Sequence, residues 1–345
     1  DADIGANAQL SYTLSPSEHF RIEEENSNSR SKSLFLILMK SLDRETTPVH
    51  RLVLTASDGG RPSLTGTMEL VISVLDVNDN APQFNQSVYN VLLPEDALRR
   101  TLVARVNATD SDTGTYGEVI YEIDTIIPPP AADIFSIDAI SGEIRLTGTL
   151  DFEAVTLYEL HIKGADKGTP PLTGHCKVVL EVLDVNDNAP EVWVTSLSVP
   201  VSEDAIAEFT TLPGSRFPLE GASDADIGAN AQLSYTLSPS EHFTLDVKSS
   251  DENRKSLFLV LVKSLDRETI PVHQLLLTAS DGGRPSLTGT MELVISVLDT
   301  NDNAPQFNQS VYKVQLPENA TVGSLVARVN ATDPDEGSNK EFSYS

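Results

Sequence analysis

One octapeptide recurs along this chain at intervals of about one small domain. LDVNDNAP occupies residues 75–82 and returns unchanged at 183–190, and the variant LDTNDNAP occupies 298–305. The three copies therefore begin 108 and then 115 residues apart, which is an ordinary length for a domain. A regular internal period predicts that the chain folds as tandem copies of one structural unit rather than as a single large domain.

The chain also repeats itself on a longer scale. Residues 1–95 match 224–318 at a constant offset of 223, without gaps and with 18 differences. Ten of these differences fall within 21–31, where RIEEENSNSRS is replaced by TLDVKSSDENR. The chain therefore consists of two kinds of unit, A and B, that alternate in the order A, B, A, B. Duplication, recombination, an assembly artefact and engineering are all open as the origin of this order. The divergent segment is either an element of specificity or an unconstrained surface loop.

Alternating apolar residues predict a β-strand immediately before each octapeptide. In MELVISVLD (68–76) the side chains of Leu70, Ile72 and Val74 share one face, and CKVVLEVLD (176–184) repeats the pattern. Period-two alternation over this length marks a strand with one buried face. Turn clusters such as SDGGRPS separate the strands, and no stretch shows convincing helical periodicity. About 110 residues of short strands predict an all-β sandwich for each unit.

Composition narrows the class of function. The chain has 51 acidic against 24 basic residues and a net charge of −27, so its surface repels nucleic acid and anionic membranes and suits divalent cations. The single cysteine, Cys176, permits no internal disulfide. It shares a strand face with Val178, Leu180 and Val182, so we expect a buried core residue, with a reactive thiol as the alternative. With no signal peptide and no apolar run near the roughly 18 residues of a membrane span, we expect an internal piece of a longer protein.

Residues with oxygen ligands recur at matching places in every unit. A glutamate near the start is followed by D-x-D-x-G, a mid-unit D-x-E, a lone turn aspartate and the D-x-N-D-N linker. The opening glutamates are Glu95, Glu203 and Glu318, and the turn aspartates are Asp58, Asp166 and Asp281. The carboxylates of the D-x-D-x-G and D-x-E motifs are Asp1, Asp3, Asp43, Glu45, Asp110, Asp112, Asp151, Glu153, Asp224, Asp226, Asp266, Glu268, Asp333 and Asp335. The linkers add Asp76, Asn78, Asp79, Asp184, Asn186, Asp187, Asp299, Asn301 and Asp302.

This donor set favours calcium. Ca²⁺ takes about six to eight oxygen ligands from carboxylates, amides and backbone carbonyls, whereas Mg²⁺ keeps several waters and seldom uses an all-protein cage. Zinc and copper are disfavoured because the motifs contain almost no nitrogen or sulfur. An EF-hand is excluded, since its loop needs Gly at position 6 and Glu at position 12, and counting from Asp1 gives Ala6 and Tyr12. A single D-x-D would indicate only a solvated turn, but four motif types that recur in fixed order around three linkers indicate binding sites.

Together these motifs resemble the extracellular cadherin repeat. The resemblance covers the whole chain. Two segments are most similar to the second and third repeats of clustered protocadherins: SRFPLEGASDADIGANAQLSYTLS and SVYKVQLPENATVGSLVARVNATDPDEGSNKEFSYS. It implies tandem Ig-like Greek-key β-sandwiches in an extended rod. The expected repeats are 1–80, which lacks its N-terminal strands, 81–188, 189–303, and 304–345, which is the start of a fourth. The chain departs from the family in two ways. The family has distinct repeats in order, whereas here a two-repeat block recurs. Residues 191–205 also resemble the opening of a later repeat of the family.

The resemblance also implies about three Ca²⁺ ions at each complete junction between repeats. The implied ligands of the first junction are Asp43, Glu45, Asp76, Asn78, Asp79, Asp110, Asp112 and Asp166. Those of the second are Glu95, Asp151, Glu153, Asp184, Asn186, Asp187, Asp224, Asp226 and Asp281, with the carbonyls of Val185, Asn188 and Asn230. Those of the third are Glu203, Asp266, Glu268, Asp299, Asn301, Asp302, Asp333 and Asp335, with the carbonyl of Asn339. At the first junction Tyr116 replaces the Asn that provides this carbonyl at the other two.

The family resemblance implies calcium-dependent, homophilic adhesion between apposed cells by a membrane-anchored parent protein. A calcium-stiffened extracellular spacer without adhesive specificity is the alternative. We expect no enzyme, because the paired carboxylates fall at unit ends and no nucleophile–His–acid set is evident. Trp193 follows an internal linker, so we expect it to pack in a core or at a sheet edge rather than to exchange with a partner. Five N-x-S/T sequons, at Asn85, Asn107, Asn308, Asn319 and Asn330, agree with an extracellular location.

Overall fold

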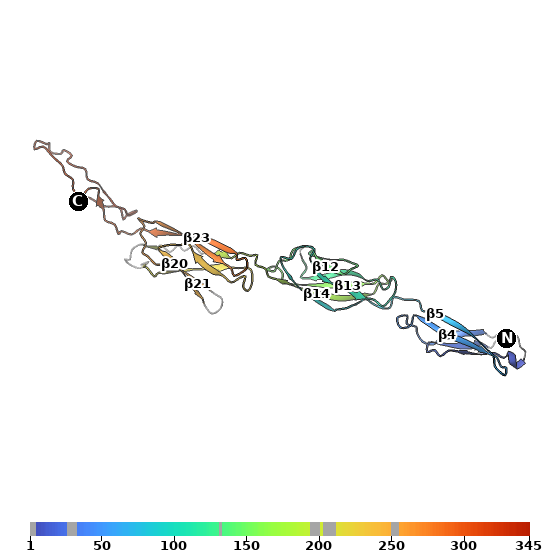
Figure 1. The fold of residues 1–345 in the computed structure, drawn as a ribbon. Coiled ribbons are helices and arrows are strands. Elements are labelled where there is room, and N and C mark those ends of the chain that lie inside the picture. Colours follow the sequence, from blue (N-terminus) through green and yellow to red (C-terminus); the bar gives the residue numbers. More distant parts are fainter. Residues whose placement is uncertain (1–4, 26–32, 131–132, 194–200, 203–211, 250–254) are drawn as a thin grey trace. The chain divides into compact units, whose positions relative to one another are not determined.

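The computed structural model consists of β-strands, with one short 3-10 helix, Gly5–Ala8, as the only helix among the described residues. It describes residues 5–25, 33–130, 133–193, 201–202, 212–249 and 255–345. The chain divides into two compact units, 1–183 and 184–345, and each is described by itself below (Figure 1). The predicted all-β class is confirmed.

The first unit contains two sets of strands. The strands before the first linker are β1 (Ser11–Leu14), β2 (Phe20–Glu25), β3 (Ser33–Leu38), β4 (Val49–Ser57) and β5 (Thr65–Ser73), in sheets β1-β4-β5 and β2-β3. After it come β6 (Gln83–Phe84), β7 (Val88–Pro94), β8 (Leu102–Arg105), β9 (Ala108–Thr109), β10 (Ile120–Ile127), β11 (Phe135–Ile137), β12 (Glu143–Leu146), β13 (Leu157–Ala165) and β14 (Thr173–Leu183). These form sheets β10-β13-β14-β7, β11-β12-β8 and β6-β9. Figure 1 shows β12, β13 and β14 in green.

The core of the 81–183 sandwich follows the predicted alternation. On β14 the side chains of Cys176, Val178, Leu180 and Val182 are buried while the residues between them are more exposed. Antiparallel pairing places Leu160 of β13 opposite Val178, so the buried faces of the two strands coincide. Burial raises the pKa of the Cys176 thiol to about 12. The expectation of a core cysteine is confirmed, because a protonated, buried thiol is a poor nucleophile.

The second unit repeats this architecture. Its strands are β15 (Glu191–Trp193), β16 (Val201–Ser202), β17 (Arg216–Leu219), β18 (Gly221–Ser223), β19 (Ser234–Leu237), β20 (Phe243–Ser249), β21 (Lys255–Leu261), β22 (Val272–Ser280), β23 (Thr288–Leu298), β24 (Gln306–Phe307) and β25 (Ala331–Thr332). They form sheets β16-β23-β22-β19, β17-β21-β20, β15-β18 and β24-β25. Trp193 lies on the short strand β15 with 52% of its surface exposed, so of the two expected positions the sheet edge is the one found.

Identical sequence is buried to different depths in the two copies. Leu293 and Val297 of β23 are buried, whereas the matching Leu70 and Val74 are only half-buried. The difference follows from the neighbouring strands, because β16 pairs in parallel with β23 at Val297. Strand β5 has no such parallel partner within the described residues. The depth to which a strand is buried therefore depends on which of its edges neighbouring strands cover. The local sequence pattern does not contain this information.

The divergent segment is partly strand. Residues 21–25 lie on β2 and pair with β3, and 26–31 fall outside the described residues. In the other copy 244–249 lie on β20, paired with β21. Of the two alternatives, an unconstrained loop does not describe the first part of the segment, which is one strand of a hairpin.

The first two linkers are each held by a glycine on the following sandwich. A Cβ built on Gly174 would lie 1.9 Å from the carbonyl oxygen of Pro82, and one on Gly289 would lie 1.8 Å from that of Pro190. Any other residue would therefore collide with the linker backbone. Pro82 is itself fully buried. Because β5, β14 and β23 end immediately before the linkers, this seating fixes where the ligand-bearing residues leave the sheet.

Candidate metal centre

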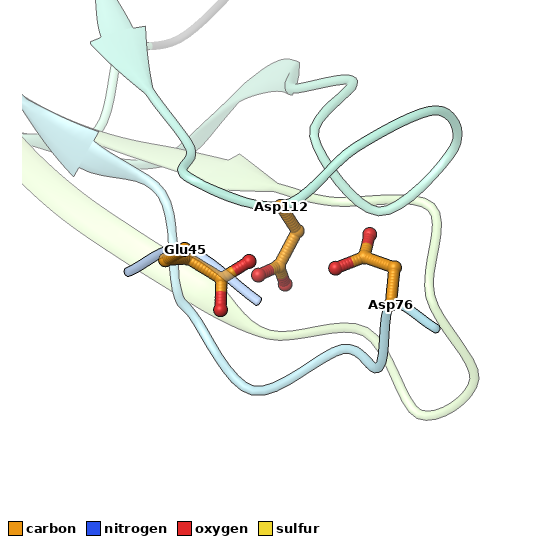
Figure 2. Close-up of side chains that lie close together, drawn as sticks. All are labelled: Glu45, Asp76 and Asp112. Carbon is orange, nitrogen blue, oxygen red and sulfur yellow. The ribbon is translucent and has the colours of Figure 1, made fainter. Parts of the chain in front are cut away.

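Three carboxylates from three separate segments meet at the first linker. Glu45 comes from the loop between β3 and β4, Asp76 from the linker, and Asp112 from the loop after β9. Their nearest oxygens all lie within 4.8 Å of one another, and Figure 2 shows the carboxylates pointing toward a common space. Asp112 is 6% exposed. The sequence-predicted convergence of the D-x-E, linker and D-x-D-x-G motifs is thus present in the structure.

The linker amide holds Asp112 in place. Asn80 donates from its backbone N to Asp112 Oδ2 (3.2 Å) and from Nδ2 to Asp112 Oδ1 (2.7 Å). The backbone N of Asp112 in turn donates to Asp110 Oδ1 (3.0 Å). The turn closes through Gly114 at φ 60°, a left-handed conformation that glycine adopts without strain. The D-x-D-x-G motif therefore shapes its own loop and presents its second aspartate to the linker.

The same arrangement recurs at the third linker. Oxygens of Glu268, Asp299 and Asp335, each 223 residues beyond its counterpart, also lie within 4.8 Å of one another. Asn303 Nδ2 donates to Asp335 Oδ1 (2.9 Å), and Asp335 is only 2% exposed. Two stretches of chain in different units thus build the same cluster.

The turn aspartates receive backbone donors and lie beside the linker amides. Asp281 accepts from the backbone N of Gly283 (3.0 Å) and Leu287 (3.0 Å), and Asn186 Nδ2 donates to it (3.1 Å). Asp166 accepts in the same way from Gly168 (2.8 Å) and Leu172 (3.0 Å). Asn78 Nδ2 donates to the carbonyl of Pro170 (3.1 Å) within that second turn.

Buried oxygens without donors mark these sites. In the described part of the chain, six buried side-chain oxygens of the predicted ligands lack a hydrogen bond: Asn78 Oδ1, Asp110 Oδ2, Asp184 Oδ1, Asn186 Oδ1, Asp224 Oδ2 and Asp226 Oδ2. The buried Asp299 Oδ1 differs from these, because Arg267 pairs with it (2.6 Å). Leaving a buried acceptor unsatisfied costs about 1–3 kcal/mol. All six belong to sequence-predicted ligands, and a hard cation would satisfy them, so the residues present fit Ca²⁺.

Burial and repulsion between neighbouring carboxylates raise the pKa of two aspartates in these sites. Burial raises the pKa of Asp110, and the charges of Asp112, Asp166 and Asp76 raise it further, against the hydrogen bond from Asp112. Burial likewise raises the pKa of Asp224, with Asp226 and Asp281 adding to the shift. A divalent cation would reverse this preference and favour the charged carboxylates.

Comparison with known proteins identifies the repeats. The family model of the cadherin domain matches residues 1–75, 89–183 and 210–298. The chain belongs to the cadherin family. Within it, protocadherin alpha-13 of Pan troglodytes is 47% identical and protocadherin alpha-1 of Homo sapiens is 49% identical, each over the whole chain. The chain spans 35% of the length of these relatives.

Solved structures agree with this assignment. The extracellular domain of protocadherin GammaB4 superposes with a TM-score of 0.84 at 37% identity, over 99% of this chain and 51% of that one. Cadherin domains 1–5 of protocadherin Gamma B2 superpose with a TM-score of 0.81, also at 37% identity, over 99% and 62%. The chain is therefore a stretch of a clustered-protocadherin ectodomain.

Several predicted ligands of the cadherin repeats face their own turns in this structure. Asp43 Oδ1 and Oδ2 accept from Thr46 N (3.0 Å) and Oγ1 (2.8 Å), and hydrogen bonds from the Thr46 side chain and backbone lower the pKa of Asp43. Asp266 accepts from Thr269 in the same way, and Asp151 Oδ1 from the backbone N of Ala154 (2.9 Å). In the D-x-E motifs at 43–45 and 266–268, it is the second acidic residue, Glu45 or Glu268, that belongs to a cluster.

The remaining predicted ligands are distributed as follows. Glu95 is 6% exposed and accepts from the backbone N of Phe152 (2.6 Å). Asp79, Asp187 and Asp302 each accept from the next linker asparagine, and Asp333 accepts from the backbone N of Asp335 (3.1 Å). Asp58 closes its own turn through Gly60 and Leu64. Glu153, Asn301 and Glu318 lie within the described residues, whereas Asp1, Asp3 and Glu203 lie outside them.

Asparagine side chains have a role that the sequence did not indicate. Asn230 and Asn339 were expected to offer backbone carbonyls, but their Nδ2 atoms donate to Asp184 Oδ2 and Asp299 Oδ2, both at 2.9 Å. Where Tyr116 replaces this asparagine, Thr113 Oγ1 donates to Asp76 Oδ2 instead (2.8 Å). The linker aspartate of every copy also accepts from one equivalent backbone N, that of Thr113 (2.7 Å), Ile227 (3.4 Å) or Glu336 (3.0 Å).

Sequence reasoning also missed a cation within the clusters. Arg44 and Arg267 stand between the two acids of their D-x-E motifs, and their guanidinium groups form ion pairs with Asp76 and Asp299. The signal was present in the sequence as DRE, against DFE at 151–153.

Proposed function

We propose that this chain binds Ca²⁺ at the junctions between its cadherin repeats and that the ions stiffen those junctions. The observation that supports this most directly is the set of buried, unsatisfied oxygens on predicted ligands. Repeats with boundaries at 1–80, 81–188, 189–303 and 304–345 are part of the same proposal.

The proposed first-junction ligands come from both sides of a linker. Glu45 and Asp43 precede it, Asp76, Asn78 and Asp79 lie in it, and Asp110, Asp112 and Asp166 follow it. Bound calcium supplies positive charge that offsets the repulsion among these carboxylates. Without it, each like-charge contact at about 4 Å costs about 4 kcal/mol at an effective dielectric near 20. Separating the repeats relieves that repulsion, so the metal-free junction is the more flexible state.

We expect calcium to change the hydrodynamic dimensions of the chain while leaving the sandwiches folded. Extracellular modules bind Ca²⁺ at about 10⁻⁴–10⁻³ M, so small-angle scattering should be compared in about 5 mM Ca²⁺ and in EDTA. The expected result is a narrower distribution of maximum dimension with calcium and an unchanged far-ultraviolet circular dichroism spectrum. An identical scattering envelope in both conditions would contradict the proposal.

We further propose that the parent protein mediates calcium-dependent, homophilic adhesion on the outer face of the plasma membrane. This rests on the protocadherin relatives, of which the chain covers about a third. A calcium-stiffened spacer requires the same ligands without an adhesive face. No helix in the described part of this stretch is long and apolar enough to cross a membrane.

Bead aggregation by the complete ectodomain separates adhesion from the spacer. Beads coated with the ectodomain should aggregate in millimolar Ca²⁺ and disperse in EDTA if it is adhesive. Beads coated with a related ectodomain and mixed with them should form separate aggregates if recognition is homophilic. Dispersed beads at every calcium concentration would favour the spacer.

The sequons are compatible with an extracellular surface. Asn85, Asn107, Asn308, Asn319 and Asn330 are all exposed. Asn85 N donates to the carbonyl of Asn107 (3.0 Å), and Asn308 N to that of Asn330 (3.0 Å), so two pairs of candidate sites lie on adjacent strand ends. We propose these asparagines as glycan acceptors.

A further inference from the structure

An arginine lies inside the third-junction cluster. The Arg267 side chain is 9% exposed. Its Nε atom lies 2.6 Å from Asp299 Oδ1, and Nη2 forms an ion pair with Glu268. Nη2 also donates to the backbone carbonyl of Pro334 (3.0 Å), and Nη1 lies 3.1 Å from Glu336 Oε1. One guanidinium therefore contacts the D-x-E motif, the linker and the start of the next repeat.

The first junction repeats this arrangement independently. The Arg44 side chain is 16% exposed, its Nε atom pairs with Asp76, and Nη2 lies 2.5 Å from Glu45 Oε1. Nη2 donates to the carbonyl of Ser111 (2.9 Å), which belongs to the following repeat. The surrounding backbone and ligands match those of the other unit, so the position is a property of the DRE motif.

These arginines use the oxygens that calcium would need. Glu45 and Asp76 are two of the three carboxylates in the first cluster, and Glu268 and Asp299 are two of the three in the last. A guanidinium at ion-pair distance occupies one of the oxygen's lone pairs and places a positive charge beside the position that a metal would take at about 2.3–2.6 Å. The planar guanidinium suits such paired carboxylates, and metal entry requires it to move.

The middle motif of the chain lacks this cation. Asp151 and Glu153 flank Phe152, whose side chain packs against the core of the 81–183 sandwich. The chain thus contains two junctions with an arginine at this position and one with a phenylalanine, within otherwise equivalent motifs.

We propose that Arg44 and Arg267 act as built-in cations that hold the linker carboxylates when calcium is absent and that calcium displaces. The two DRE junctions then bind calcium more weakly than the DFE junction and keep more order without it. This inference rests on the proposed calcium binding. Because a divalent ion and a guanidinium within about 5 Å repel even at high dielectric, removing the arginine should tighten calcium binding by about tenfold.

Exchange of the two residue types tests this. Calcium titration calorimetry on the whole chain would compare Arg44→Phe, Arg267→Phe and Phe152→Arg with the parent. Arg267→Gln serves as a second variant that avoids a new apolar side chain. Arg51→Gln is the matched control, because it removes the same charge from an exposed pair with Glu69 (3.0 Å) and introduces the residue found at 274.

The expected result is about tenfold tighter binding in one class of sites for each arginine replacement, weaker binding for Phe152→Arg, and no change for Arg51→Gln. In EDTA, hydrogen exchange of the linker amides 299–303 should become several-fold faster in Arg267→Phe and Arg267→Gln. Calcium binding with parental affinity in both Arg267 variants would overturn this inference alone. If neither the parent nor any variant binds calcium, the proposed function fails and this inference fails with it.

Discussion

Replacing Asp110 by asparagine should stabilise its repeat in EDTA and destabilise it in calcium. Burial and three neighbouring carboxylates raise the pKa of Asp110 in the folded chain. A raised carboxyl pKa means that ionisation at neutral pH opposes folding. Asparagine keeps the shape and removes the charge, so without metal the free energy of unfolding should rise by on the order of 1 kcal/mol.

With calcium present the sign reverses. Ligand binding to the folded state alone adds about 2.7 kcal/mol of stability at a hundredfold excess over the dissociation constant. Loss of one carboxylate weakens that binding, so the same variant should lose on the order of 1–3 kcal/mol. A stability effect of the same sign in both conditions would show that Asp110 does not face a metal.

Urea unfolding at pH 7 in EDTA and in about 5 mM Ca²⁺ measures both effects. Asp138→Asn is the control within the same repeat. Asp138 accepts from the backbone N of Ser141 (2.8 Å) and Ile140 (3.0 Å), and these bonds lower its pKa. Its replacement should therefore destabilise the repeat by a similar amount with or without calcium.

The order of the motifs predicted which segments converge, because each motif is anchored to a strand end. Glu45, Asp76 and Asp112 are 31 and 36 residues apart in sequence, yet a sandwich whose last strand runs into the linker brings them together. Alternation predicted the buried face of β14 for the same reason: period two is a property of the strand itself.

Other features depended on contacts that the sequence pattern does not specify. Asp43 and Glu45 are equivalent in the motif, but Thr46 draws Asp43 into its own turn. The motif predicts a carbonyl ligand at Asn230 but does not show that the Asn230 side chain also reaches Asp184 (2.9 Å). Side-chain direction in a loop depends on the local donors, and motif spacing does not record them.

A pair of histidines should make the repeat that contains Arg267 sensitive to mild acid. The tilted rings of His242 and His273 are in contact with their centroids 4.9 Å apart, and His19 and His50 form the same pair at 5.0 Å. His273 is 7% exposed, and its Nε2 has no partner among the described residues. The nearby charges Glu241 and Lys263 pair with each other at the surface (3.2 Å). An imidazolium at His273 would therefore be buried beside a second imidazole without a counter-charge.

The sign of the pH effect follows from this environment. Burial lowers the pKa of His273, and His242 lowers it further. The unfolded chain then binds more protons than the folded chain once the pH falls below about 6.5. The contribution of neutral His273 to the free energy of unfolding is fully present above that pH. It is lost as the pH falls toward the folded pKa, by at most about 1.4 kcal/mol per pH unit for one group.

The 81–183 sandwich shows which residue can replace His273 in an experiment. On β13 the position equivalent to His273 is Tyr158, which makes an edge-to-face contact with Phe135 (ring centroids 5.4 Å apart), as His273 does with Phe243 (5.3 Å). Between pH 7.4 and 5.5, the parent should lose on the order of 1 kcal/mol in urea unfolding, and His273→Tyr should lose less. The exposed His175→Gln is the control and should follow the parent. Because all three chains share the same calcium ligands, any effect of acid on those ligands cancels in the comparison. Equal losses in the parent and His273→Tyr would mean that the acid sensitivity of the repeat originates in another group.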